Sequence, residues 1–253
     1  MNPDWRPLDV ELNHWRAESL PLPLWWRDDD AVAPSPALEQ LSALSHRLGL
    51  PVHLAIIPEQ AQPELATYLQ EHPELIPLVH GWSHQNHAQT GQKKCEFPDQ
   101  RSIDEALQDI EAGLARLQSL FGGAALPIFV PPWNRISADL LPWLAGAGFS
   151  ALSTFTPRKT PKAAPGLWQI NCHLDPIDWR GSRSLYAPEQ LISQVVQHLR
   201  DRRLDRADNK EPYGILTHHL VHDAAIWHFT EALLDRLLTG PGRVWSFENE
   251  NLR

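Results

Sequence analysis

The chain has 253 residues and a formal net charge of -9, and 42% of its residues are hydrophobic. This length suits one large core, so we expect a single domain over residues 1–253, with residues 1–20 as a short N-terminal extension. The negative charge disfavours nucleic-acid partners, and no apolar run is long enough to cross a bilayer. Without a secretory pattern at the N-terminus, and with only two cysteines, the sequence predicts a reducing, cytoplasmic location.

Apolar runs typical of strands alternate along the chain with patterns typical of helices. Strands are predicted at residues 24–27, 52–57, 76–79, 128–130, 149–153, 167–171, 213–217 and 244–247. Helices are predicted at 36–48, from Pro63, at 103–121 after a capping-box pattern of Ser102 and Glu105, at 137–145, at 188–203 and around 226–237. Residues 88–100 and 156–166 are predicted to be exposed loops.

This alternation predicts an α/β fold in which parallel strands are joined by crossover helices. About eight strands in a chain of this length favour a closed or distorted (β/α) barrel with outer helices over an open sheet. In such barrels the reactive side chains lie where strands end and enter loops.

Polar clusters do follow five of the predicted strands. They are Arg27-Asp28-Asp29-Asp30, His80 through His87, Pro131 through Arg135, Cys172 through Arg180, and His218 through Asp223. The strand ends of a barrel would bring these acids, imidazoles and aromatic rings to one rim.

The aspartate triplet and the histidine pair together indicate a metal site. Three adjacent carboxylates repel one another, and a divalent cation would relieve that repulsion. His80 and His84 are four residues apart, which places both rings on one side of a helical turn or tight loop. Two imidazoles and one carboxylate make a three-ligand site with positions left open for water.

Such an ion would lower the pKa of a bound water, and a neighbouring aspartate could take the proton of that water. A histidine from another strand could then protonate a leaving amine, and His218, His219 and His222 are the candidates. His87 lies outside the one-turn spacing, so we expect it behind the ligands or facing the substrate.

The order of these clusters resembles that of the polysaccharide deacetylases, the NodB-homology or carbohydrate esterase family 4 hydrolases, over roughly residues 24–222. In the first motif of that family, a strand ends in two aspartates, of which the first is the base and the second a metal ligand. Aligning the pair directly after the strand implies Asp28 as base and Asp29 as ligand, with Asp30 beside them. A shift of one residue would instead imply Asp29 and Asp30.

The second and third motifs are present with departures. The pattern H-[ST]-x-x-H matches His80 to His84 with Gly81 in the hydroxyl position, so the resemblance implies both histidines as metal ligands. The third motif, Arg-x-Pro-aromatic-Gly, has Val130 where the family has an arginine that holds the catalytic aspartate. Arg27 or Arg135 is the candidate replacement.

The remaining motifs supply the implied acid and the substrate pocket. Leu216-Thr217-His218 matches the fifth motif and implies His218 as general acid. The fourth motif is Asp175-Pro-Ile-Asp178-Trp179. The substrate would contact Trp82, Trp133, Trp179 and Leu216, with supporting roles expected for Asp175, Asp178, His219 and His222.

The resemblance implies a distorted barrel of seven or eight mostly parallel strands and a hydrolase that removes an acetyl group from the nitrogen of an N-acetylated sugar. The implied cofactor is a divalent metal ion, with zinc favoured over cobalt, manganese or nickel, and the implied partner is a small-molecule or oligosaccharide substrate. Two alternatives remain open: an amidase acting on a small non-sugar amide, and a carbohydrate-binding barrel with a degraded site, which the missing arginine favours.

Overall fold

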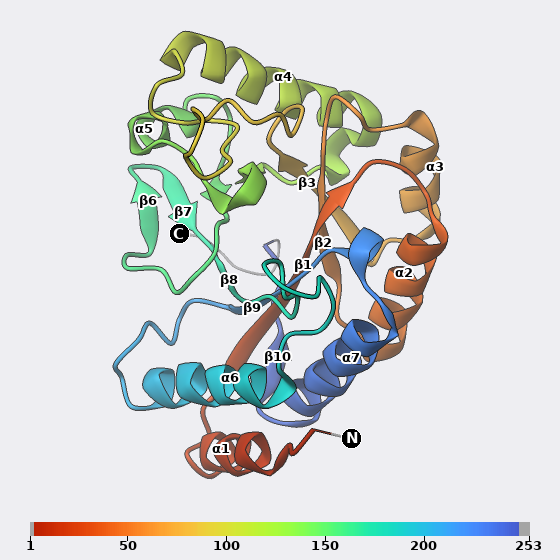
Figure 1. The fold of residues 1–253 in the computed structure, drawn as a ribbon, viewed down its shortest axis with the longest axis vertical. Helices are drawn as coiled ribbons and strands as arrows, with labels where there is room; N and C mark the ends of the chain where they lie inside the picture. The colour runs from red at the N-terminus through yellow and green to blue at the C-terminus, as the bar shows by residue number, and fades with distance from the viewer. Residues whose placement is uncertain (1–2, 248–253) are drawn as a thin grey trace.

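The computed structural model describes residues 3–247, which form one curved, mostly parallel sheet with helices around its outer side (Figure 1). The strand order is β6-β7-β5-β4-β3-β2-β1-β9-β8, with β10 paired to β1, and this path does not close within the described residues. Only the β6–β7 pair is antiparallel among the strand pairs described. The α/β barrel-like fold with mostly parallel strands is confirmed, although its sheet is open.

The strands are β1 (Leu22–Ala31), β2 (Val52–Ile56), β3 (Leu75–His80), β4 (Ile128–Val130), β5 (Ala151–Leu152), β6 (Lys162–Ala164), β7 (Leu167–Gln169), β8 (Cys172–Leu174), β9 (Tyr213–Thr217) and β10 (Gly242–Val244). The α-helices are α1 (Arg6–Ala17), α2 (Pro36–Leu48), α3 (Pro63–Glu71), α4 (Ile103–Phe121), α5 (Leu141–Leu144), α6 (Pro188–Arg203) and α7 (Ala224–Thr239). Short 3-10 turns are η1 (Gly122–Ala124), η2 (Pro132–Asn134), η3 (Ala138–Leu140) and η4 (His219–Val221). No helix in residues 3–247 has the length and apolar character needed to cross a membrane.

The core has two parts because successive side chains of a strand point to opposite faces of the sheet. On β1, Leu24 and Trp26 belong to the cluster that contains the helix side chains. Trp25 belongs instead to a cluster made of residues from strands and loops, including Trp245, which fills the inside of the curve. This alternation also decides which way the aspartates that follow on β1 point.

Helix α1 is packed into the molecule. Leu8 and Trp15 are fully buried in the main core cluster. Arg203, at the end of α6, donates a hydrogen bond from Nε to Oε1 of Glu11 at 2.7 Å. The segment expected to be a short extension therefore contributes a core helix from residue 6 onward.

Helix boundaries follow the local signals in the sequence. Ser35 accepts a hydrogen bond on its side chain from the backbone N of Leu38, and Gly49 ends α2 with a φ of 62°. Helix α4 begins at Ile103 as predicted, but Ser102 makes no side-chain cap. The predicted helix after Ser137 is divided into η3 and α5.

The predictions for the shorter segments were wrong in places. Cys172–Leu174 is strand β8 rather than part of a polar loop, and the last strand is Gly242–Val244 rather than 244–247. The loop predicted at 88–100 is exposed only in part, because Phe97 is buried and pairs with Ile136 through an isolated β-bridge. Residues 162–164, in the other predicted loop, form β6. Strands of three residues are too short to produce a readable alternation.

Candidate metal-dependent active site

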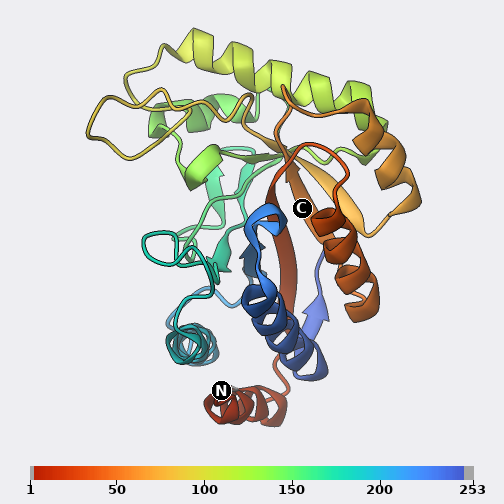
Figure 2. The same ribbon diagram turned by 45° about the vertical axis from the view of Figure 1, so that its right-hand side comes forward.

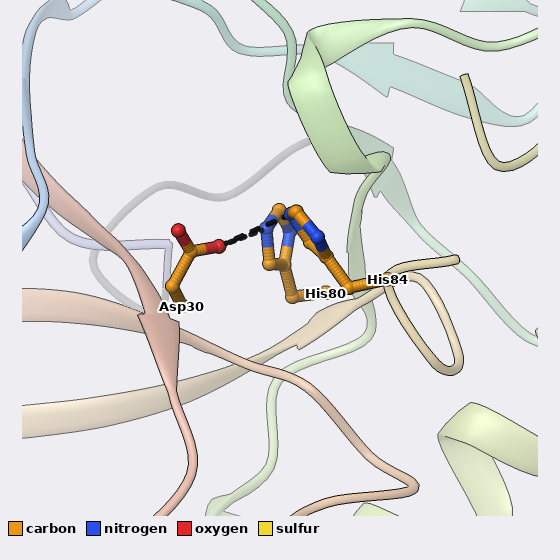
Figure 3. Close-up of side chains that lie close together, drawn as sticks. All are labelled: Asp30, His80 and His84. Atoms are coloured by element: carbon orange, nitrogen blue, oxygen red, sulfur yellow. Dashed lines mark hydrogen bonds and ion pairs between the residues drawn. The ribbon is translucent and has the colours of Figure 1, made fainter. Parts of the chain in front are cut away.

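Asp30, His80 and His84 form a compact cluster at the carboxyl ends of β1 and β3 (Figure 3). Oδ1 of Asp30 lies 3.1 Å from Nε2 of His80 and 3.3 Å from Nε2 of His84. One ligand atom from each of the three residues lies within 4.8 Å of the others. His80 is buried, whereas Asp30 and His84 are partly exposed, so the cluster has one open side.

The hydrogen bonding of His80 fits a cation between these side chains. Its Nδ1 lies 2.9 Å from the carbonyl oxygen of Val130, and because a carbonyl only accepts, Nδ1 must carry the proton. In the neutral ring, Nε2 then presents a lone pair toward the carboxylate of Asp30. Two facing acceptors need a proton or a cation between them, and a metal-binding histidine commonly donates its other N–H to a carbonyl in this way.

The pKa shifts of His80 and Asp30 also indicate that a positive charge is favoured at the cluster. Burial alone would lower the pKa of His80, but the negative charges of Asp29 and Asp30 outweigh burial and raise it. Burial would raise the pKa of Asp30, but hydrogen bonds with His80 and His84 hold it well below its ordinary value. The carboxylate therefore favours a positive charge at this position, which a divalent ion would supply.

The three aspartates of the triplet point in different directions. Asp29 points to the inside of the curved sheet, where Arg27 Nε and Nη2 donate to its two oxygens at 2.8 Å and 2.9 Å. Asp30 lies within a register irregularity of β1, between Asp28 and Ala31, and has a φ of 75°, in the left-handed region. This turn brings Asp30, rather than Asp29, against the two histidines. The geometry thus matches the second of the two alignments considered above, the one shifted by one residue, which pairs Asp29 with Asp30.

Asp28 lies on the opposite side of β1 from Asp29 and is fully buried. Its carboxylate accepts hydrogen bonds from Oγ1 of Thr217 at 2.6 Å and from the backbone N of His219 at 3.0 Å. The ring of His219 pairs with the same carboxylate. Asp28 does not line the cavity that contains the cluster, so it is not placed to act as the base.

Arg27 has the contacts expected of the missing arginine of the third motif. Besides Asp29, its guanidinium donates to Oγ of Ser153 at 2.7 Å and to Oδ1 of Asn134 at 2.6 Å, and it is fully buried. Arg135 is exposed and donates instead to the carbonyl of Lys94. Of the two candidate replacements, Arg27 therefore contacts the aspartate.

Glu96 holds the loop that carries His84, a role that the sequence did not indicate. Its buried carboxylate accepts hydrogen bonds from the backbone N atoms of Ser83 at 2.7 Å and His84 at 3.1 Å. Gly81 has a φ of 58°, and a Cβ there would lie 2.1 Å from Oε2 of Glu96. Glycine at the hydroxyl position of the second motif thus makes room for this carboxylate.

The cluster opens into a cavity of about 1030 Å³ at the carboxyl ends of the strands. Among the predicted site residues, those that line it are Asp29, Asp30, His80, His84, Trp133, Arg135, Asp175, Trp179, Leu216 and His218. Those that do not line it are Arg27, Asp28, Trp82, His87, Asp178, His219 and His222. His87 is exposed, and Asp178 accepts hydrogen bonds from the backbone N atoms of Gly181 and Ser182.

His218 lies on the cavity wall next to Trp179. The two ring centroids are 4.8 Å apart with the planes at 78°, and Nδ1 of His218 is buried without a hydrogen-bond partner among the described residues. Nε1 of Trp179 donates to Oδ2 of Asp175 at 2.7 Å, and burial raises the pKa of Asp175. His222 accepts from the backbone N of His218 and packs against Trp227, outside the cavity.

No sequence-family model matches the chain, and no curated protein matches it in sequence. Solved structures do share its fold. A family 4 carbohydrate esterase from Streptomyces lividans has 16% sequence identity and a TM-score of 0.55, over 89% of this chain and 92% of that one. A Mycobacterium smegmatis protein assigned to the polysaccharide deacetylases has 14% identity and a TM-score of 0.61, over 84% of this chain and 74% of that one.

A third similar structure is the peptidoglycan deacetylase PdaC of Bacillus subtilis. It has 16% identity and a TM-score of 0.53, over 91% of this chain and 90% of that one. Together these likenesses confirm the fold that the motif resemblance implied. The chain has the α/β fold of the family 4 carbohydrate esterases and polysaccharide deacetylases, at a sequence identity that marks it as divergent from them.

Proposed function

We propose that the chain is a metal-dependent hydrolase that removes an acyl group, in the first instance acetyl, from the amide nitrogen of an N-acetylated sugar or sugar conjugate. The single observation that carries the proposal is the convergence of Asp30, His80 and His84 on one edge of a cavity that Asp29 and His218 also line. A metal triad, a candidate base and a candidate acid are the parts that hydrolysis of an amide requires.

Asp30, His80 and His84 would hold the ion, and zinc suits two imidazoles and one carboxylate. When bound, a divalent ion supplies Lewis acidity that polarises the amide carbonyl and lowers the pKa of the attacking water. The open side of the cluster faces the cavity, where the substrate would enter. Trp133 packs against His84 with ring centroids 4.3 Å apart, which limits the movement of that ligand.

Asp29 would accept the proton of the attacking water. Its two oxygens are fixed by the two parallel hydrogen bonds from Arg27, so the carboxylate is held in one orientation during the attack. As the new carbon–oxygen bond forms and the carbon–nitrogen bond breaks, His218 would donate a proton to the departing amine. The products are the free amine and the carboxylic acid, acetate for an acetyl substrate.

Apolar side chains beside His218 suit a small acyl group. Leu216 and Trp179 both line the cavity next to it, and Leu216 is almost fully buried. A binding barrel with a degraded site would need none of the proton-transfer groups, yet Asp29 and His218 both remain at the cavity, and Arg27 supplies the arginine contact that the third motif lacks. These residues favour an enzyme over the binding alternative.

The test is acetate release by protein that has been stripped with EDTA and reloaded with zinc, cobalt, manganese or nickel. The substrates are N-acetylated amino sugars and their oligomers, with acetamide, formamide and simple N-acetyl amines as the non-sugar panel. We expect release from the sugars with metal and none without it. Release confined to the non-sugar panel would favour the small-amide amidase, and no release from any substrate by fully loaded protein would contradict the proposal.

A further inference from the structure

The mouth of the cavity is cationic although the chain as a whole carries a net charge of -9. Four basic residues line this one cavity: Lys94, Arg135, Arg180 and Arg183. All four are exposed. A cleft that concentrates one sign of charge on a protein of the opposite net charge raises the local concentration of oppositely charged ligands.

The four cations come from two sides of the cavity. Lys94 lies in the loop between β3 and α4. Nη1 of Arg135 donates a hydrogen bond to the carbonyl oxygen of Lys94 at 2.9 Å, so these two residues are on the same side of the cavity. Arg180 and Arg183 lie in the loop between β8 and α6. Figure 2 shows these two loops, yellow and teal, projecting on the same side of the molecule. A ligand in the cavity would therefore have basic side chains on both flanks.

No described acidic residue neutralises these four side chains. None of them takes part in an ion pair within residues 3–247. The acids that line the same cavity are already engaged: Asp29 by Arg27, and Asp175 by Nε1 of Trp179. The third, Asp30, faces the two histidines and would be neutralised further by a bound cation.

Two of the basic groups lie over aromatic rings on the cavity wall. Nζ of Lys94 is 5.8 Å from the ring centroid of Trp133, and Cζ of Arg183 is 5.5 Å from that of Trp179. Each side of the cavity thus pairs an aromatic face, which suits a sugar ring, with a cation that can bind an anionic substituent. The volume, about 1030 Å³, is slightly above the roughly 300–1,000 Å³ that is usual for small-molecule pockets.

We propose that the acylated sugar this cavity accepts carries a phosphate group, which the cations of the two flanking loops bind while the amide lies at the Asp30–His80–His84 cluster. This inference rests on the proposed function and narrows its substrate from neutral polysaccharide to a phosphorylated sugar conjugate. Arginine binds phosphate through two parallel N–H···O contacts, and the two arginines of the β8–α6 loop have side chains that no described acid engages. A sugar linked to a nucleotide and a sugar linked to a lipid by phosphate share this chemistry.

The experiment measures binding to metal-free protein, so that phosphate has no bound ion to contact. The phosphorylated probes are N-acetylglucosamine 1-phosphate, UDP-N-acetylglucosamine and a polyprenyl-diphosphate-linked N-acetylglucosamine in detergent micelles, and the neutral probe is di-N-acetylchitobiose. We expect at least one phosphorylated probe to bind about tenfold or more tightly than the neutral one, with binding that weakens as salt is added. Preference for the nucleotide or the lipid probe identifies the source of the phosphate.

The variant pair R180Q/R183Q should weaken binding of the phosphorylated probe by about tenfold or more, and should weaken binding of the neutral probe by a smaller factor. The matched control is R200Q/R206Q, which removes the same charge from two exposed arginines that do not line the cavity. Equal binding of neutral and phosphorylated probes, or equal effects of the two double variants, would overturn the inference.

Turnover by metal-loaded protein separates this inference from the proposed function. Phosphate-selective binding without acetate release from any probe would contradict the hydrolase and leave a cationic sugar-phosphate site. Acetate release from di-N-acetylchitobiose with the same kcat/KM as from the phosphorylated probes would support the hydrolase and overturn the phosphate requirement.

Discussion

Arg27 and Asp29, two residues apart on the same strand, form a buried ion pair joined by two hydrogen bonds of 2.8 Å and 2.9 Å. Residues i and i+2 of a strand face the same side of the sheet, so β1 alone brings the pair together. The motif that normally supplies the arginine has Val130 on β4, where the side chain is buried in the inner apolar cluster. Strand β1 therefore supplies both partners of this contact.

Replacing Arg27 by lysine tests whether Arg27 holds Asp29 in place, the role that the third motif gives to an arginine at the position of Val130. Lysine retains the charge but cannot make two parallel contacts to Asp29 and further contacts to Ser153 and Asn134, so Asp29 loses its fixed orientation. We expect R27K to lower kcat by roughly 10²-fold, because proton transfer depends on position. Metal content, measured by elemental analysis, should stay unchanged.

The control for R27K is R158K, which changes an arginine paired with Asp208 outside the cavity. It should leave kcat close to that of the unaltered protein. If R27K retains full kcat while its fold is intact by circular dichroism, Arg27 does not position the base.

Single changes to asparagine test which aspartate of the triplet binds the metal and which acts as the base. D30N should remove the metal, because Asp30 supplies the oxygen that faces both histidines. D29N should retain the metal but lose turnover by roughly 10²–10⁴-fold, as expected for a general base. Zinc content after dialysis and acetate release are the two measurements. Metal loss in D29N with retention in D30N would restore the alignment that makes Asp29 the ligand.

D28N separates a structural carboxylate from the reactive ones. Asp28 is buried, and its carboxylate pairs with the ring of His219. The change to asparagine removes the negative charge, so the buried ring loses its charged partner. Breaking a buried pair costs about 3–5 kcal/mol, which chemical denaturation would detect as a lower free energy of unfolding. The metal content of folded D28N should be normal, and a loss of metal without a loss of stability would place Asp28 in the site instead.

Much of the fold followed from the sequence because its long elements have strong periodic signals. The ranges predicted for α2, α4 and β9 coincide with the observed Pro36–Leu48, Ile103–Phe121 and Tyr213–Thr217. Strands β6, β7 and β8 have only three residues each, with β6 and β8 at opposite ends of the sheet path, and their pairing depends on tertiary contacts that no local pattern records.

At the site, the sequence predicted that the two histidines and one of the three aspartates would come together, but it left open which aspartate this would be. Which aspartate faces the histidines depends on the φ of 75° at Asp30. This backbone angle interrupts the regular alternation of side chains along β1 and turns the side chain of Asp30 toward His80 and His84. Aspartate adopts this conformation more readily than most residues, yet the sequence contains no glycine or turn signal to announce it. Glu96 was missed because a single acid in a predicted loop looks solvated, and only the fold brings it against the backbone of the histidine loop.

The Glu96 contacts predict that E96Q weakens metal binding. Glutamine keeps the size of the side chain but removes its negative charge. The hydrogen bonds that the side-chain oxygen accepts from the backbone N–H groups of Ser83 and His84 become weaker, so the loop that carries His84 is held less firmly. We expect zinc affinity to fall by about 10–100-fold, the usual effect of losing a residue that supports a metal ligand. Competition with a zinc indicator measures this directly. The exposed change E189Q on α6 is the control, and equal zinc affinity in the two variants would contradict the role given to Glu96.

His53 and His173 should each lower the free energy of unfolding as the pH is lowered from about 6.5 to about 4, because these two buried histidines resist protonation in the folded protein. Burial lowers the pKa of His53 to about 4, and burial also lowers the pKa of His173 to about 4. Above about pH 6.5 both rings are neutral in the folded and unfolded chains, so neither affects the pH dependence. Below that pH the unfolded chain binds protons that the folded chain excludes, which favours unfolding until the folded pKa is reached.

By about pH 5 each of these histidines should lower the free energy of unfolding by about 2 kcal/mol, because a proton bound only by the unfolded chain favours unfolding by about 1.4 kcal/mol for each step of one in pH. Denaturant unfolding at neutral pH and at about pH 5, with EDTA present to exclude metal binding, measures the loss. The variant H53Q removes one titrating group, a ring that packs against Trp25 and Trp245. The decrease in the free energy of unfolding between the two pH values should therefore be about 2 kcal/mol smaller in H53Q than in the unaltered protein. An identical loss in H53Q and the unaltered protein would show that His53 is not a buried neutral group, and would direct attention to His173 and its fully buried partner Glu211.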